Sequence, residues 1–203
     1  EAQGDLRERV EQHLRRHAAP GARVTALAPI AGGAVQDLLR VEVEGLDAPR
    51  FVLRSDAPRP LPGSIDRARE RVAIEAARAA GVTTPAARWP GVGLVRPGAG
   101  AYFLDWVDGE AIGRKVVSAP ALAPARAALG GQLARELANL HTVTATTRPE
   151  LVAALGAPPA DPLQAQLRAL RAMSDALRAP RPAVEVALAW LSTRAGSSSP
   201  VLV

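Results

Sequence analysis

Residues 101–112 read AYFLDWVDGEAI, and this stretch decides how the rest of the chain is interpreted. Aromatic residues make up only 3% of the 203-residue sequence, yet Tyr102, Phe103 and Trp106 fall within five positions. An acidic turn, Asp-Gly-Glu at 108–110, follows at once. The sequence before this stretch alternates as β-strands do, whereas the sequence after it has helical spacing. The stretch therefore lies at a junction between two lobes, where ligands are often bound.

The segments before the junction predict a small antiparallel sheet. Leu39, Val41 and Val43 alternate with charged residues, which is typical of a half-buried strand. The turn sequence GLDAP at 45–49 then leads to a second strand over 50–54, which we expect to pair antiparallel with the first. The segments with strand character are 23–30, 39–44, 50–54, 86–96 and 101–107.

Two helices are predicted to accompany this sheet. Leu6, Val10 and Leu14 recur every fourth residue, which indicates an amphipathic helix over 5–18. A second helix is expected at about 65–80, with Ser64 as its cap.

The second helix has two distinct faces. Its charged face, which we expect in solvent, carries Arg67, Arg71, Glu75 and Arg78. Its other face is small and apolar except for one carboxylate, and consists of Glu70, Ala73, Ile74 and Ala77. A carboxylate on an inward face is costly unless a cation meets it, so Glu70 is predicted to have a cationic partner.

The sequence after the junction predicts helices only. Apolar residues with helical spacing are Leu129, Leu133, Leu137, Leu140, Leu163, Leu167, Leu170, Leu177, Val184, Leu188 and Leu191. The expected fold class is α+β, with an N-terminal helix at 1–20, a β-rich lobe at 21–107, a hinge at 104–109 and a helical lobe at 110–203.

Each part of the β-rich lobe has a physical use if the ligand is a nucleoside triphosphate. A turn with Gly32 and Gly33 lets the backbone approach phosphates closely. A cation at the end of a strand, Arg54, can reach the phosphates while the carboxylate of Glu70 holds it in place. The exposed backbone of the junction strand can pair with an adenine edge, with apolar side chains as a shelf for the ring.

Three longer stretches resemble one known family. The segment VLRSDAPRPLPGSIDRARERV at 52–72, the hinge-like AYFLDWVDGEAI and the helical LARELANLHTV at 133–143 occur in the order found in the aminoglycoside phosphotransferase family. These are small-molecule kinases with a protein-kinase-like fold. The stretches are most similar to the branch that includes kinase-like domains fused to acyl-CoA dehydrogenases.

The resemblance implies roles for individual residues and a use of ATP and Mg. The residues implied in nucleotide binding are Gly32, Gly33, Ala34, Arg54, Glu70, Asp105, Trp106 and Val107. The three small residues would cover the phosphates, and the last three would present hinge backbone to adenine. Arg54 stands where many kinases have lysine, but arginine also keeps its charge and can pair with Glu70.

The family's catalytic loop, His-Gly-Asp followed by Asn, does not occur in the sequence, nor does the later magnesium-binding Asp. We expect these groups beyond Val203, so the chain as given carries no catalytic residue and no metal ligand. The implied function is an ATP-dependent kinase acting on a hydroxyl of a small molecule. The alternative is a non-catalytic nucleotide-binding or interaction module.

The acceptor and partners are left open by the sequence. An aminoglycoside, another amino alcohol and a hydroxyacyl thioester all remain candidates for the acceptor. The sparse carboxylates of residues 110–203 weigh slightly against a cationic aminoglycoside. The N-terminal helix is either a lid on the sheet or a contact of a homodimer.

The net charge of +5 at first suggests nucleic-acid binding, but the arginines are scattered among acidic residues. We therefore expect no nucleic-acid partner. We also expect no membrane association, because no apolar run reaches the ~18 residues of a membrane helix. The lack of cysteine and of a signal-peptide pattern suggests a cytoplasmic protein.

Ordinary structural explanations exist for the same residues. Gly32 and Gly33 fit a plain hairpin turn, and Arg54 with Glu70 fits a structural ion pair. The aromatic residues at 102–106 fit a core. His13 and His17 share a helix face, which we expect in solvent rather than at a metal.

Overall fold

A computed structural model describes residues 2–30, 37–61, 63–177, 179 and 181–193. The chain divides into two compact units, Glu1–Leu140 and His141–Val203. Gly32, Gly33 and Ala34 lie outside the described residues, as does the C-terminal PVLV. The division into lobes expected from the sequence stays a prediction.

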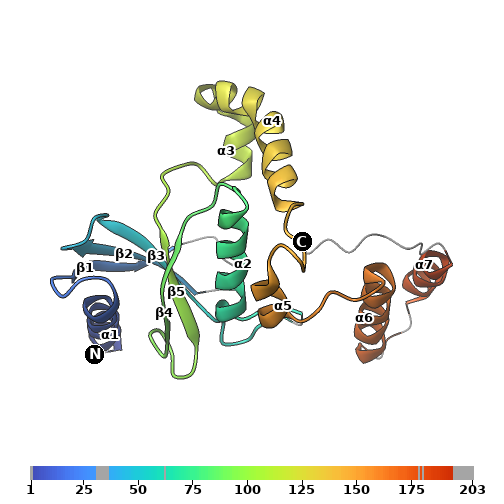
Figure 1. Cartoon of the computed structure of the whole chain (residues 1–203), viewed down its shortest axis with the longest axis horizontal. Coiled ribbons are helices and arrows are strands. Elements are labelled where there is room, and N and C mark those ends of the chain that lie inside the picture. The colour runs from blue at the N-terminus through green and yellow to red at the C-terminus, as the bar shows by residue number, and fades with distance from the viewer. Residues whose placement is uncertain (1, 31–36, 62, 178, 180, 194–203) are drawn as a thin grey trace. The chain divides into compact units, whose positions relative to one another are not determined.

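The first unit is built around one five-stranded antiparallel sheet (Figure 1). In sheet order its strands are β1 (Arg23–Pro29), β2 (Asp37–Glu44), β3 (Arg50–Ser55), β5 (Gly100–Asp105) and β4 (Ala87–Val92). The expected antiparallel pairing of β2 with β3 is confirmed, with Val41 opposite Phe51. β3 lies at the centre of the sheet, so hydrogen bonds to β2 on one side and to β5 on the other fix its position.

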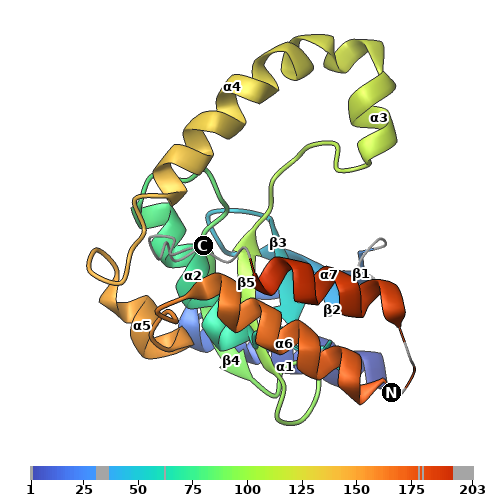
Figure 2. The same ribbon diagram turned by 90° about the vertical axis from the view of Figure 1, so that its right-hand side faces the viewer.

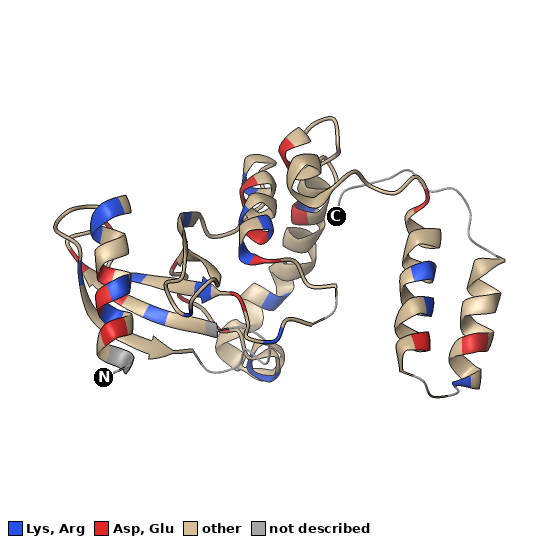
Figure 3. Cartoon of the chain, turned by 90° about the horizontal axis from the view of Figure 1, so that it is seen from below, with Lys and Arg blue, Asp and Glu red and all other residues tan. Residues whose placement is uncertain are grey.

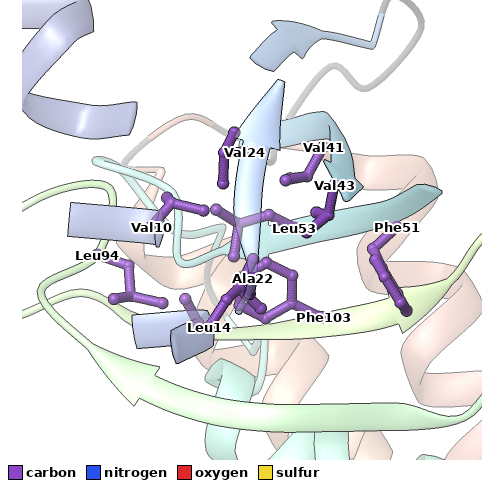
Figure 4. Packing of buried hydrophobic residues seen from close by; sticks show 11 residues of the cluster. Val10, Leu14, Ala22, Val24, Val41, Val43, Phe51, Leu53, Leu94 and Phe103 are labelled. Carbon is purple, nitrogen blue, oxygen red and sulfur yellow. The ribbon is translucent and has the colours of Figure 1, made fainter. Parts of the chain in front are cut away.

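Helix α1 (Ala2–His17) covers one face of the sheet. Val10 and Leu14 of α1 are fully buried against alternate residues of the strands, such as Leu53 and Phe103 (Figure 4). Strand alternation sends every second side chain to this face, and burying apolar surface there stabilises the sheet by roughly 25 cal/mol per Å². The hydrophobic core of the unit therefore lies between α1 and the sheet.

Helix α2 (Arg67–Ala79) packs on the other face of the sheet, against β4 and β5. Its N-cap is Asp66, whose side chain accepts a hydrogen bond of 2.8 Å from the backbone N–H of Arg69. The prediction that Ser64 caps this helix is therefore wrong by two residues. The helix ends before Gly81, whose φ of 89° is a conformation that favours glycine.

The turn between β2 and β3 depends on Gly45. Its φ is 81°, and a Cβ placed there would lie 2.4 Å from the backbone oxygen of Gly21. Glycine therefore lets this turn pass close to the segment that joins α1 to β1.

The described residues after the sheet are helical, as predicted. They form α3 (Gly113–Ser118), a short 3₁₀ turn (Pro120–Leu122), α4 (Ala123–Leu140), α5 (Pro149–Leu155), α6 (Pro162–Ala176) and α7 (Pro182–Ser192). Figure 2 shows α3 running through a short turn into the long α4. The α+β class is confirmed. Within the described residues no helix is long and apolar enough to span a membrane.

The C-terminal end of α4 is tied to the loop that follows α2. The side-chain amide of Asn139 donates to the carbonyl of Gly81 at 2.9 Å. The carboxylate of Glu136 accepts from the backbone N–H and the hydroxyl of Thr83, at 2.8 and 2.7 Å. These hydrogen bonds lower the pKa of Glu136 and attach the first helical segment to the sheet part of the unit.

Candidate functional site

The carboxylate of Glu70 is the centre of a charged cluster between α2 and the sheet. Its Oε1 accepts a hydrogen bond of 2.8 Å from Nη2 of Arg54, and its Oε2 accepts one of 2.6 Å from the hydroxyl of Tyr102. Nη1 of Arg67 also donates to Oε2. The sequence-based expectation that a cation meets the inward Glu70 is therefore confirmed.

The sheet register explains why these groups meet. Arg54 on β3 lies directly opposite Tyr102 on β5, and cross-strand partners point to the same face of a sheet. That face carries α2, while the alternate residues Leu53 and Phe103 face α1. The cluster thus occupies the face of the sheet that the core does not use.

Burial makes this cluster electrostatically tight. The side chains of Arg54 and Glu70 are only 22% and 19% exposed. The phenol of Tyr102 has a pKa raised well above its usual range, mainly by burial and also by its hydrogen bond to Glu70. Tyr102 therefore stays protonated and acts as a hydrogen-bond donor to the carboxylate.

Arg67 was predicted in solvent, and that prediction is wrong. The residue is only 5% exposed, and besides Glu70 its guanidinium donates to the carbonyl of Ile65 at 3.0 Å. Its Nε lies 3.4 Å from Oδ1 of Asp56. Helical periodicity put Arg67 with Arg71, but Arg67 also stands three residues before Glu70, which is a spacing for a favourable ion pair. That spacing could have identified Arg67 as an ion-pair partner of Glu70 from the sequence.

Asp56 connects the cluster to the edge of β5. One oxygen of its carboxylate accepts from the backbone N–H of Arg67 at 2.9 Å, and the other accepts from that of Gly100 at 2.8 Å. The side chain of Arg96 donates to the carbonyl of Asp56. Asp56, which sequence reasoning did not select, thus joins the end of β3, the start of α2 and the start of β5.

The hinge residues lie where β5 ends. The carboxylate of Asp105 pairs with the guanidinium of Arg88, and its backbone N–H donates to the carbonyl of Ala86 at 3.2 Å. The indole N–H of Trp106 donates to Asp108 at 2.8 Å. Val107 is 66% exposed. Within the part of the chain that the structure describes, no hydrogen-bond partner is found for the backbone of Trp106 or Val107.

The aromatic shelf expected from the sequence is only partly present. Phe103 is fully buried on the α1 face, where its ring lies 5.8 Å from that of Trp89 in an edge-on arrangement. It therefore cannot also contact a ligand beside Arg54. Leu104, together with its cross-strand partner Val52, provides the apolar surface on that face instead.

A cavity of about 320 Å³ lies on the α1 face, between the end of α1, the Gly45 turn and β4. Phe51, Trp89 and the side chain of Asp105 contribute to its wall. The Asp105 side chain thus points away from Arg54. The Asp105 side chain therefore does not contact the α2 face.

The prediction that His13 and His17 lie on a solvated face is wrong for His13, whereas His17 is exposed as predicted. His13 is 8% exposed, its Nε2 lies 3.0 Å from the carbonyl oxygen of Trp89, and its ring lies 4.3 Å from that of His17. The described residues contain no cluster of three groups suited to a metal ion. His13 is therefore part of the interface between α1 and the sheet, and His17 lies beside it in solvent.

Comparison with known proteins gives one match. The sequence pattern of the phosphotransferase enzyme family covers residues 26–203. No curated protein and no solved structure matches the chain. The matched region begins within β1 and contains the other four strands, α2, the Glu70 cluster and the helices that follow.

Proposed function

Because the chain belongs to the phosphotransferase enzyme family, whose fold is protein-kinase-like, we propose that it binds ATP on the α2 face of its sheet. In the same proposal the protein is a kinase that transfers the γ-phosphoryl group to a hydroxyl of a small molecule. The observation that carries the proposal is the ion pair between Arg54 on the central strand and Glu70 on α2.

The Arg54–Glu70 pair suits the binding of phosphates. A guanidinium on the central strand offers a permanent charge and several donors, and the carboxylate orients it. The cluster of Arg54, Arg67, Glu70 and Asp56 has two charges of each sign, so the carboxylates balance the two arginines before any ligand binds. Holding the donor in place before the ligand arrives favours transfer by positioning and charge neutralisation.

The hinge supports adenine binding. The backbone at Trp106 and Val107 offers hydrogen-bonding groups to a purine edge, and Leu104 and Val52 offer apolar surface next to it. Gly32, Gly33 and Ala34 complete the proposal as the phosphate cover, although they lie outside the described residues.

Magnesium, which would neutralise charge on the transferred phosphoryl group, is part of the proposal without assigned ligands. The described residues include no cluster of three suitable groups, and the His-Gly-Asp pattern does not occur in the sequence. The proposal for these 203 residues is therefore the nucleotide site, and we assign none of them as the base.

The proposal also includes the class of compound that accepts the phosphoryl group. We favour an amino alcohol or a hydroxyacyl thioester, since the sequence resembles the branch that includes domains fused to acyl-CoA dehydrogenases. Use of ATP would place the protein in the cytoplasm. Of the two roles proposed for α1, a homodimer contact is less favoured than a lid on the sheet, because α1 buries its apolar residues against its own sheet.

The proposal is tested by Arg54→Ala in calorimetric titration with ATP and magnesium. Loss of a charged hydrogen bond costs about 1.5–3 kcal/mol, so we expect ATP affinity to fall by roughly 10- to 100-fold. Arg23→Ala is the control, since Arg23 pairs with Glu44 at an exposed site on β1.

Unchanged ATP affinity in Arg54→Ala would remove Arg54 from the site. Failure of the unaltered protein to bind ATP would reject the nucleotide site altogether. If the natural full-length protein binds ATP but phosphorylates no hydroxylated compound in a broad screen, the alternative of a non-catalytic nucleotide-binding module is favoured.

A further inference from the structure

We propose that Arg67 is a positioning residue of the ATP site, which holds Glu70, and through it Arg54, in one arrangement before the nucleotide binds. This inference rests on the proposed function, and it adds a residue that contacts the carboxylate rather than the ligand. It assigns to Arg67 an effect on ATP affinity without direct contact with ATP.

The burial of Arg67 is the first observation. An arginine is almost never this deeply buried unless its charge is paired, and Arg67 is only 5% exposed. Its recorded partners are the carboxylates of Glu70 and Asp56 and the carbonyl of Ile65. Since leaving a buried charge without its partner is strongly unfavourable, Arg67 and Glu70 constrain each other's side-chain conformation.

The division of contacts on Glu70 is the second observation. Oε1 accepts from Arg54, whereas Oε2 accepts from Arg67 and Tyr102. With both oxygens engaged, rotation of the carboxylate would break contacts that it now makes. Without Arg67, only the neutral Tyr102 would hold Oε2, and the carboxylate could rotate away from Arg54. The contact between Glu70 and the Arg54 guanidinium therefore depends on Arg67.

The anchoring of Arg67 itself is the third observation. Asp56 accepts from the backbone N–H of Arg67 and lies next to its guanidinium, so both ends of the residue meet one carboxylate. The same carboxylate accepts from Gly100 on β5, where an added Cβ would lie 2.8 Å from Oδ2 of Asp56. Arg67 is thus attached to the sheet and not only to its own helix.

These contacts describe a site that is set before its ligand arrives. Moving α2 away from the sheet would separate Arg67 from Asp56 and Glu70 from Arg54 together. Groups that are already in place lose less freedom on binding, which raises affinity. Arg67 would therefore contribute to ATP affinity by reducing the disorder of Arg54.

The test compares ATP affinity in four proteins by calorimetric titration with magnesium present. Arg67→Met is expected to weaken ATP binding about tenfold. Arg67→Lys is expected to recover part of that loss, because lysine restores the positive charge but lacks the paired N–H donors of the guanidinium. The matched control is Arg71→Met, one turn later on α2, because the half-buried Arg71 pairs with Glu75 and not with Glu70.

A double-mutant cycle separates positioning from a general loss of stability. In the Arg54→Ala protein, Arg67→Met should have no further effect on ATP affinity, because the residue that it positions is already gone. Urea unfolding of each variant measures stability separately. A merely structural Arg67 would change stability while leaving the ATP affinity of the folded protein as it was.

Each result of this test decides the proposal. ATP affinity unchanged in Arg67→Met, or a loss that simply adds to that of Arg54→Ala, overturns the inference and leaves the ATP site in place. If Arg67→Met does not fold, Arg67→Lys decides in the same way, since unchanged affinity there also overturns the inference. If the unaltered protein does not bind ATP, the proposed function fails, and the inference fails with it.

Discussion

His13 lies in the interface between α1 and the sheet, where a neutral imidazole is favoured. Its Nε2–H donates to the carbonyl of Trp89, so Nδ1 is the nitrogen that would take up a second proton. Burial lowers the pKa of His13 from its usual 6.5, and the neighbouring Arg16 and His17 lower it further. Because folding lowers this pKa, the unfolded chain binds the proton more readily than the folded protein does.

We predict that the free energy of unfolding falls as the pH drops below about 6.5, and that His13→Gln removes much of this decrease. The stability contributed by neutral His13 is fully present above the unfolded pKa and is lost as pH falls toward the folded pKa. Each unit between these pKa values corresponds to about 1.4 kcal/mol. Urea unfolding at a series of pH values between about 8 and 5 measures the effect.

The control for this prediction is His141→Gln, which alters an exposed histidine outside the α1 interface. It should leave the pH profile of stability as it is in the unaltered protein. An identical pH profile in His13→Gln would show that other groups cause the acid sensitivity.

At the level of elements, α2 is the helix on which the candidate site depends. It begins at Arg67, directly after its N-cap Asp66 and three residues before Glu70. Its first turn is held from two sides, because Asp66 accepts from the N–H of Arg69 while Asp56 accepts from the N–H of Arg67. The helix start therefore sets the position of the charged side chains that follow it.

We predict that Asp66→Ala lowers the free energy of unfolding by about 1 kcal/mol, whereas Ser64→Ala changes it by less than about 0.5 kcal/mol. The physical reason is the loss of the only side-chain acceptor recorded for the Arg69 N–H among the described residues. Urea unfolding measures both variants. Asp66→Asn, which keeps a capping side chain, should retain most of the stability, and an equal loss in Ser64→Ala would contradict this assignment of the cap.

At the scale of the whole molecule, arginines that contribute to the positive net charge are paired with acidic side chains. Helix α1 pairs Arg9 with Asp5 and Arg15 with Glu11, and Arg171 pairs with Glu185 in the second unit. Figure 3 shows basic and acidic residues next to one another along the helices of each unit. An interleaved pattern of this kind supports the proposal that nucleic acid is not a ligand.

We predict that the protein binds a DNA duplex only weakly at low salt, despite its net charge of +5. Fluorescence anisotropy with a labelled duplex, at about 50 and about 200 mM salt, measures this. Phosphate binding by a basic patch would appear as an affinity that falls steeply between these salt concentrations. That result would replace the nucleotide proposal with nucleic-acid binding as the function of the arginines.

The sequence by itself determined the order and type of the strands and of the longer helices, whereas the short helices α3 and α5 were not predicted individually. The strict alternation around Val41 and Val43, and the four-residue spacing of Val10 and Leu14, reflect local geometry that each segment carries without its neighbours. The Glu70 partner was also predictable, because an inward carboxylate requires a cation and Arg54 ends a nearby strand.

Only the tertiary structure decided which side of the sheet each group serves. Phe103 and Tyr102 are neighbours on one strand and point to opposite faces, and the packing of α1 and α2 decides that Phe103 joins the core while Tyr102 donates to Glu70. Arg67 and His13 looked solvent-facing along their own helices. Their burial comes from Asp56 and Trp89, which lie far from them in sequence and reach them only through the packing of α1 and α2 against the sheet.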